Sequence, residues 1–263
     1  MNNYKLLWAL ILLFALLLRL YGINLNPVGL SHDDELNEII NAKSLALVGE
    51  HAPGHVAGIF TKNDECLGNC VHGELGPYIL IPWMMFFPLD MVWSKIPFIL
   101  ISTVLVFFAG KLFENLSKNR SIGLIAGFLI AINPWSVHFG RTAYFTTFSY
   151  AFYLLALYLY TRHKSYKSNL LFGTFSSIIA SLFYFGTKPI LPLIIAWGIA
   201  YNCYKFKKRH LKFTLLLILA STVIIGGYLI LLSNSFAGRR FNEIGIGNVL
   251  DIKSIVDQQR RVS

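Results

Sequence analysis

The stretch LLWALILLFALLLRLYGI, residues 6–23, carries one charged side chain, Arg19, and approaches the roughly 20 apolar residues that a helix needs to cross a hydrocarbon core. Lys5 precedes this stretch, as a basic residue precedes the apolar part of a secretory signal. The stretch is long for such a signal, however, and no small-x-small cleavage site follows Gly22. We therefore interpret it as a retained transmembrane helix.

Similar apolar runs recur along most of the chain. Hydrophobic residues make up 55% of the 263 residues and charged residues 14%, against about 25% charged residues in ordinary soluble domains. Because lipid offers no hydrogen-bond partners to an open backbone, segments that cross it are expected to be helical. The sequence predicts an all-α, polytopic transmembrane bundle of about seven spans: Leu6–Ile23, Ile96–Phe113, Ile122–Phe139, Phe145–Tyr160, Leu170–Phe185, Ile190–Tyr204 and Phe213–Leu232.

One further apolar piece, Pro77–Met91, is shorter and is interrupted by Pro82 and Pro88. Its length as a helix would be roughly 23 Å at 1.5 Å per residue, which is short for a crossing. We predict a juxtamembrane or re-entrant helix.

The basic residues behind the net charge of +10 lie in short clusters between the spans. This pattern is typical of topology signals and leaves no basic face for nucleic acid. With seven spans and the N-terminus inside, three clusters share the cytoplasmic side with Lys5. Eight spans with the N-terminus outside also satisfy the clusters, and only Lys5 and the short Pro77–Met91 argue against that topology. The clusters are Lys111, Lys118 and Arg120; Arg162, Lys164 and Lys167; and Lys205, Lys207, Lys208, Arg209 and Lys212.

The seven-span topology divides the chain into a membrane module, residues 1–232, and an extracytoplasmic tail, residues 233–263. The first outer loop of the module, residues 24–95, holds nine of the thirteen acidic residues, so we expect any chemistry there. These nine are Asp33, Asp34, Glu35, Glu38, Glu50, Asp64, Glu65, Glu74 and Asp90.

The strongest local motif is NPVGLSHDDE, residues 26–35, which follows the first span closely. Asp33, Asp34 and Glu35 would favour the positive end of a helix dipole, worth about 0.3–1 kcal/mol each. Three adjacent acids exceed what capping needs, and a carboxylate held at a membrane surface can act as a general base. The apolar residues that follow recur at helical spacing and predict an amphipathic helix on the outer membrane surface: Leu36, Ile39, Ile40 and Leu47.

Two cations are expected at the outer ends of later spans. Arg141 ends the stretch INPWSVHFGR, residues 132–141, and Lys188 lies in the short turn FGTKP, residues 185–189. Interfacial anchoring and snorkelling explain such positions. The functional alternative is that both side chains bind an anionic lipid phosphate, and Arg19 is ambiguous in the same way.

No metal site is predicted. Cys66, Cys70 and His72 resemble a fragment of one, but structural zinc usually needs four ligands in a tighter pattern. A loop disulfide or two free thiols explain the cysteines better. Asp33, Asp34 and Glu35 can bind a divalent cation, although three hard oxygen ligands do not make a cage.

These stretches together resemble the N-terminal membrane module of C-type (GT-C) glycosyltransferases, in the branch of dolichyl-phosphate-mannose protein mannosyltransferases and lipid A aminoarabinose transferases. The resemblance covers nearly the whole chain in order. It rests on residues 26–35 with Asn41-Ala42-Lys43-Ser44-Leu45, on Lys95-Ile96-Pro97, on Asn133-Pro134-Trp135 with Gly140-Arg141, and on Lys188 with Pro192.

The resemblance implies a multi-pass enzyme of the cell membrane with an extracytoplasmic active site and juxtamembrane helices in its first outer loop. Such enzymes transfer a sugar, with inversion, from a polyprenyl-phosphate carrier to a protein, lipid or glycan acceptor. Asp34 matches the general base best, and Asp33 is an alternative shifted by one residue. With Asp34 as the base, Asp33 and Glu35 would orient the site. Arg141 and Lys188 would hold the carrier phosphate.

Two other classes remain open. A transporter or lipid flippase would carry ionisable residues in mid-span and paired discontinuous helices, whereas charges here cluster at span ends and in loops. The third class is an inactive, truncated remnant that assembles with a partner.

Overall fold

The computed structural model describes residues 3–24, 33–49, 75–162 and 165–206, and five single positions between 215 and 226. All regular structure in these ranges is helical, which confirms the all-α prediction there. The elements are α1 (Asn3–Leu20), α2 (Asp33–Val48), α3 (Gly76–Phe86), α4 (Met91–Ser117), α5 (Arg120–Ile132), α6 (Pro134–Arg141), α7 (Thr146–Thr161), α8 (Tyr166–Ser181), the 3₁₀ helix η1 (Phe185–Ile190) and α9 (Leu191–Phe206).

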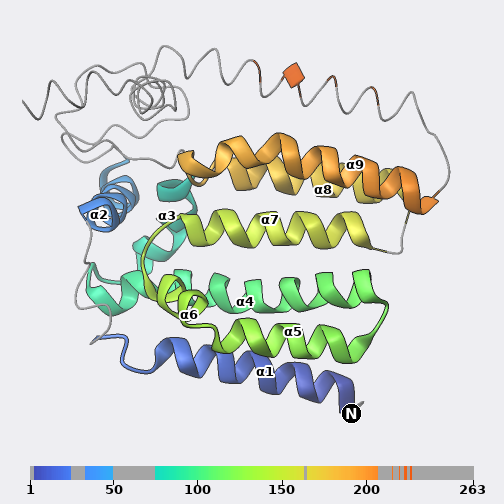
Figure 1. Cartoon of the computed structure of the whole chain (residues 1–263). Helices are drawn as coiled ribbons and strands as arrows, with labels where there is room; N and C mark the ends of the chain where they lie inside the picture. The colour runs from blue at the N-terminus through green and yellow to red at the C-terminus, as the bar shows by residue number, and fades with distance from the viewer. Residues whose placement is uncertain are drawn as a thin grey trace, which may run out of the picture.

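The long helices lie side by side in layers (Figure 1). α4 packs between α1 and α5 on one side and α7 on the other, and α7 packs in turn against α8 and α9. The helices α2, α3 and α6 gather at the end of the bundle opposite the N-terminus. This arrangement gives the bundle two chemically different ends.

Two described helices are long and apolar enough to cross a membrane, α1 and α4. They confirm the helices expected at Leu6–Ile23 and Ile96–Phe113, although α1 ends at Leu20 and α4 is longer than expected. α7, α8 and α9 have 16 residues each, or about 24 Å, which is less than a hydrocarbon core of about 30 Å. The seven-span count is therefore not confirmed. Of the last expected span, the structure describes only five positions, all helical: Leu215, Leu219, Thr222, Val223 and Gly226.

The span expected at Ile122–Phe139 is broken, and this corrects the prediction. α5 ends at Ile132, and α6 leaves it at an angle of 59°. Pro134 lacks the backbone N–H that would continue the helix, and the Asn133 side chain accepts a hydrogen bond from Ser136 N at 3.1 Å. The pair crosses as one bent span or ends in a re-entrant turn, giving up to three candidate spans.

The short helix expected at Pro77–Met91 is present as α3, but it ends at Phe86. Its 11 residues extend about 16 Å, too little to cross a membrane. Phe87 is extended, and Asp90 then caps a new helix by accepting a hydrogen bond from Trp93 N at 2.8 Å. α3 and α4 are therefore separate helices.

The amphipathic helix expected after residue 35 is α2, which begins at Asp33. Its pattern is only partly as predicted: Ile39 is buried, whereas Leu36 and Leu47 are exposed. The buried face of α2 joins α3, α4 and α7 in one apolar core, whose fully buried members include Ile39, Ala42, Leu80, Met84, Phe98, Phe145 and Phe183.

At the other end of the bundle, Tyr160 shows how closely α7, α8 and α9 pack. Its ring lies against Gly173 of α8 and Gly198 of α9, where any added Cβ atom would overlap the ring. Its hydroxyl pairs with Thr174 Oγ1 at 3.0 Å. Two glycines facing one aromatic ring thus set the spacing of three helices.

Candidate functional site

α2, which carries the acidic motif, is attached to α3 through Lys43. The Lys43 ammonium donates hydrogen bonds to the carbonyls of Met84, at 2.6 Å, and Phe87, at 2.9 Å. These carbonyls belong to the C-terminal turn of α3, which has no further helical donors and attracts positive charge. Lys43 therefore caps α3 and holds α2 against it.

α3 is attached to α4 through a carbonyl that a proline has freed. Pro97 has no N–H to donate to the Trp93 carbonyl, and the Trp83 indole N–H donates to that oxygen instead, at 2.8 Å. The ring of Phe87 stacks between the rings of Trp83 and Trp93, at centroid distances of 4.0 and 4.5 Å. The three helices α2, α3 and α4 are thus joined in series.

Buried polar side chains lie on α2 and at the start of α4. Asn41, Ser94 and Lys95 each have no exposed surface, and Ser94 Oγ has no hydrogen-bond partner within the described ranges. Sequence reasoning treated Asn41 and Lys95 only as part of a resemblance and did not propose them as site residues. The signal for Lys95 was present: a lysine at the outer end of a span runs against the positive-inside preference.

The Arg141 guanidinium makes structural contacts through two of its nitrogens, Nε and Nη2. Its side chain donates to the carbonyls of Leu18, Arg19 and Tyr21, the last at 2.6 Å, and so caps the C-terminus of α1. These bonds fix Arg141 at the junction of α1 and α6, and its predicted binding of a carrier phosphate stays a prediction. The sequence did not reveal a contact between residues more than 100 positions apart.

Arg19 has a related structural role and is fully buried. Its guanidinium donates to Ser102 Oγ at 2.9 Å and to Ser136 Oγ at 2.8 Å, as well as to the carbonyls of Ala15 and Ala131. A buried guanidinium is tolerated when hydrogen bonds satisfy its donors. Arg19 therefore connects α1, α4 and the bend between α5 and α6.

Lys188 lies half-buried in η1, which α7 holds in place. Ser149 Oγ pairs with Thr187 Oγ1 at 2.7 Å, and the Tyr153 hydroxyl donates to the Thr187 carbonyl at 2.9 Å. Phe183, next to η1, belongs to the same apolar core as Ile39 of α2. The residue Phe183, which leads into η1, and the helix α2 therefore share one core at one end of the bundle.

The backbone of Asp33, Asp34 and Glu35 forms the first turn of α2, as predicted. The side chains of these three residues lie outside the described part of the structure, as do Cys66, Cys70 and His72. Within the described ranges, no group of three or more His, Cys, Asp or Glu side chains could hold a metal ion.

An apolar groove of about 370 Å³ runs between α3 and α4, with α7 at its base. Leu100 and Val104 on its wall are half-exposed. Such a surface suits a hydrocarbon chain rather than a polar ligand. Its other lining residues are Ile79, Leu80, Pro82, Trp83, Pro97, Ile101 and Phe148.

Comparison of the chain with family models, with curated proteins and with solved structures found no match.

Proposed function

We propose that this protein is a multi-pass membrane glycosyltransferase that moves a sugar from a polyprenyl-phosphate carrier to an extracytoplasmic acceptor. One observation supports the proposal above the others: a single apolar core joins α2, which begins with Asp33, Asp34 and Glu35, to the segment that carries Lys188. An acidic helix start and a cation at one end of a membrane bundle are the two charges that such a transfer uses.

In the proposed reaction, Asp34 takes the proton from the acceptor hydroxyl as its oxygen attacks the anomeric carbon. The bond from that carbon to the carrier phosphate breaks on the opposite face, so the sugar is inverted. Lys188 stabilises the negative charge that develops on the leaving phosphate. Asp33 and Glu35 orient the acceptor, and Arg141 fixes the end of α1.

The apolar groove between α3 and α4 is the proposed place for the polyprenyl chain. It lies beside α3, which Lys43 joins to α2, so a lipid chain bound there would bring its phosphate toward the acidic end. We place the acidic end of the bundle outside the cytoplasm, because the basic residues at the opposite end favour the cytoplasmic side.

The proposal is tested with Asp34→Asn in the full-length protein in membranes, supplied with undecaprenyl-phosphate-linked hexoses and pentoses. Loss of a general base typically costs about 10²–10⁴-fold in rate. The matched control is Glu38→Gln, which removes an acid one turn further along α2. If Asp34→Asn transfers sugar as fast as the unchanged protein, Asp34 is not the base.

A second candidate is a lipid flippase, which the break at Asn133 beside the buried Arg19 favours, because discontinuous helices and buried charges are features of transporters. The two functions separate in liposomes that contain the purified protein. A flippase moves a fluorescent lipid between leaflets without any sugar donor, whereas the transferase consumes the donor and leaves lipid distribution unchanged.

A further inference from the structure

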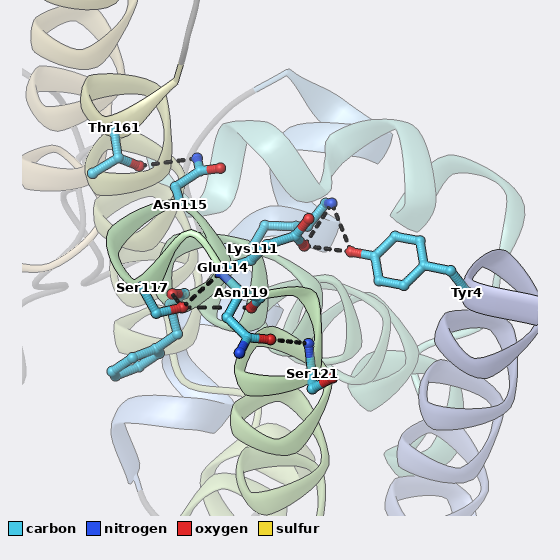
Figure 2. Close-up of polar contacts among 9 residues, drawn as sticks. Tyr4, Lys111, Glu114, Asn115, Ser117, Asn119, Ser121 and Thr161 are labelled. Atoms are coloured by element: carbon cyan, nitrogen blue, oxygen red, sulfur yellow. Dashed lines mark hydrogen bonds and ion pairs between the residues drawn. The ribbon is translucent and has the colours of Figure 1, made fainter.

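The end of the bundle opposite α2 is strongly basic. In the part of this end that the structure describes, seven lysines and arginines stand against one carboxylate, Glu114. Glu114 is already occupied, because Lys111 forms an ion pair with it at 2.8 Å and the Tyr4 hydroxyl also donates to it, as Figure 2 shows. The seven are Lys5, Lys111, Lys118, Arg120, Arg162, Lys167 and Lys205.

Three helix ends meet at this basic end. The Asn115 side chain near the end of α4 donates to Thr161 Oγ1 at the end of α7, at 3.1 Å (Figure 2). Lys205, in the last turn of α9, donates to the carbonyls of Thr161 at 2.6 Å and Arg162 at 2.9 Å. Lys118, the C-cap of α4, is thereby brought near Lys205. Burial, and then the charge of Lys118, lower the pKa of Lys205, which lies beyond the apolar run 190–204.

Several cations of this end lie over aromatic rings. Arg162 lies over Tyr158, with 5.8 Å between the guanidinium carbon and the ring centroid, and Arg120 lies over Tyr4 at 5.3 Å. Lys205 lies over the Tyr201 ring at 5.4 Å. Rings and cations at one level are typical of the headgroup region of a bilayer. The arrangement places these charges where lipid phosphates lie.

Exposed apolar side chains adjoin the cations. Phe113 and Leu116 of α4 precede Lys118 and are 46% and 43% exposed, and Tyr204, next to Lys205, is 85% exposed. A site for a soluble anion does not need an apolar border, whereas a phospholipid has an acyl chain to place against one. The surface therefore fits a molecule with a phosphate at one end and a hydrocarbon chain at the other.

We propose that Lys118, Arg162 and Lys205 form a binding site for the headgroup of an anionic phospholipid, with its acyl chains along Phe113 and Leu116. Arg162 can fork onto two phosphate oxygens, and Lys118 supplies a compact charge from the end of α4. This site is independent of the proposed transferase reaction, which belongs to the opposite end of the bundle.

The test is native mass spectrometry of the full-length protein in detergent, titrated with phosphatidylglycerol or phosphatidylcholine of the same acyl chains. We expect phosphatidylglycerol to be retained preferentially. Because each basic residue near a membrane surface contributes an attraction equivalent to about fivefold in affinity, Lys118→Gln with Arg162→Gln should weaken phosphatidylglycerol retention by roughly 30-fold. Retention of phosphatidylcholine should not change.

Two control variants keep the result interpretable. Lys118→Arg with Arg162→Lys keeps the charges and should keep most of the selectivity, and Lys5→Gln removes a charge from the same end without touching the site. Lys205 is left unchanged, because it caps α7. Equal retention of both lipids, no effect of the double Gln variant, or full displacement of the lipid by millimolar inorganic phosphate would each overturn the proposal.

Discussion

The indole N–H of Trp83 donates to the carbonyl of Trp93 at 2.8 Å, at the position in α4 where Pro97 has removed the helix's own donor. A proline within a helix usually leaves one carbonyl to water or to a neighbouring side chain. Here the side chain comes from α3, so the interruption of one helix becomes the docking point of another.

The first prediction uses this pairing in a double-mutant cycle. Trp83→Phe keeps an aromatic ring but loses the donor, and we expect it to cost about 0.5–1.5 kcal/mol of unfolding free energy. Pro97→Ala restores a backbone donor for Trp93, so Trp83→Phe should cost less in that background. Unfolding in mixed micelles measures both values. Equal costs in the two backgrounds would show that the bond does not compensate for Pro97.

The second prediction concerns Lys43. Lys43→Met keeps most of the apolar stem but removes two charged hydrogen bonds to the end of α3, a loss of about 1.5–3 kcal/mol per bond at most. We expect faster hydrogen exchange in α2 and α3 and unchanged exchange in α7 and α8. The neighbouring Ser44→Ala serves as the control and should leave exchange in α2 as it is. Faster exchange spread evenly over all helices would argue against a local role.

The third prediction separates structure from chemistry at the two predicted phosphate ligands. Arg141→Gln removes the cap of α1 and should lower the melting temperature whether or not a polyprenyl-phosphate sugar is present. Lys188→Gln should leave the melting temperature nearly unchanged and reduce transfer of the sugar. If Arg141→Gln instead raises KM with no change in stability, Arg141 binds the carrier after all.

The fourth prediction concerns the packing of Tyr160. Gly198→Ala or Gly173→Ala would place a methyl group into the ring, and overpacking of this kind typically costs about 1–3 kcal/mol. Tyr160→Phe keeps the ring and loses only the contacts of its hydroxyl with Thr174 and Ser177, so it should cost less. Thermal unfolding of the three variants gives the order. A larger loss for Tyr160→Phe than for either alanine variant would contradict it.

The sequence predicted the elements whose signals are local. Long apolar runs indicated α1 and α4. Pro82 within α3 and Pro88 after it indicated a helix too short to cross a membrane. The break at Asn133 was missed because apolar residues continue through Phe139, even though an Asn-Pro pair is a known start signal for a helix. The length and hydropathy of residues 122–139 predict one continuous helix, whereas the cap at Asn133 predicts a new one.

The contacts that organise the candidate site join distant parts of the chain, and no local pattern announces them. Arg141 was expected at the interface as an anchor or as a phosphate ligand, and the sequence did not indicate that it donates to carbonyls of α1. Lys43 was expected in an amphipathic helix, and Trp83 in a juxtamembrane or re-entrant helix. The end of α3 leaves the carbonyl acceptors of Lys43 without backbone donors, and Pro97 does the same for the carbonyl acceptor of Trp83. Whether a side chain such as Lys43 or Trp83 lies close enough to donate to such a carbonyl depends on tertiary packing. The periodicity of apolar residues in the sequence does not show this packing.

The bend at Asn133 also places two neighbouring helices of unequal length side by side. α4 has 27 residues, or about 40 Å, and α5 has 13, or about 20 Å. A bilayer that matches α4 is therefore too thick for α5, and the lipids bordering α5 must shorten or tilt their acyl chains to cover it. A protein inserted in this way would deform one leaflet beside α6 and attract lipids with shorter tails, so its stability would depend on bilayer thickness.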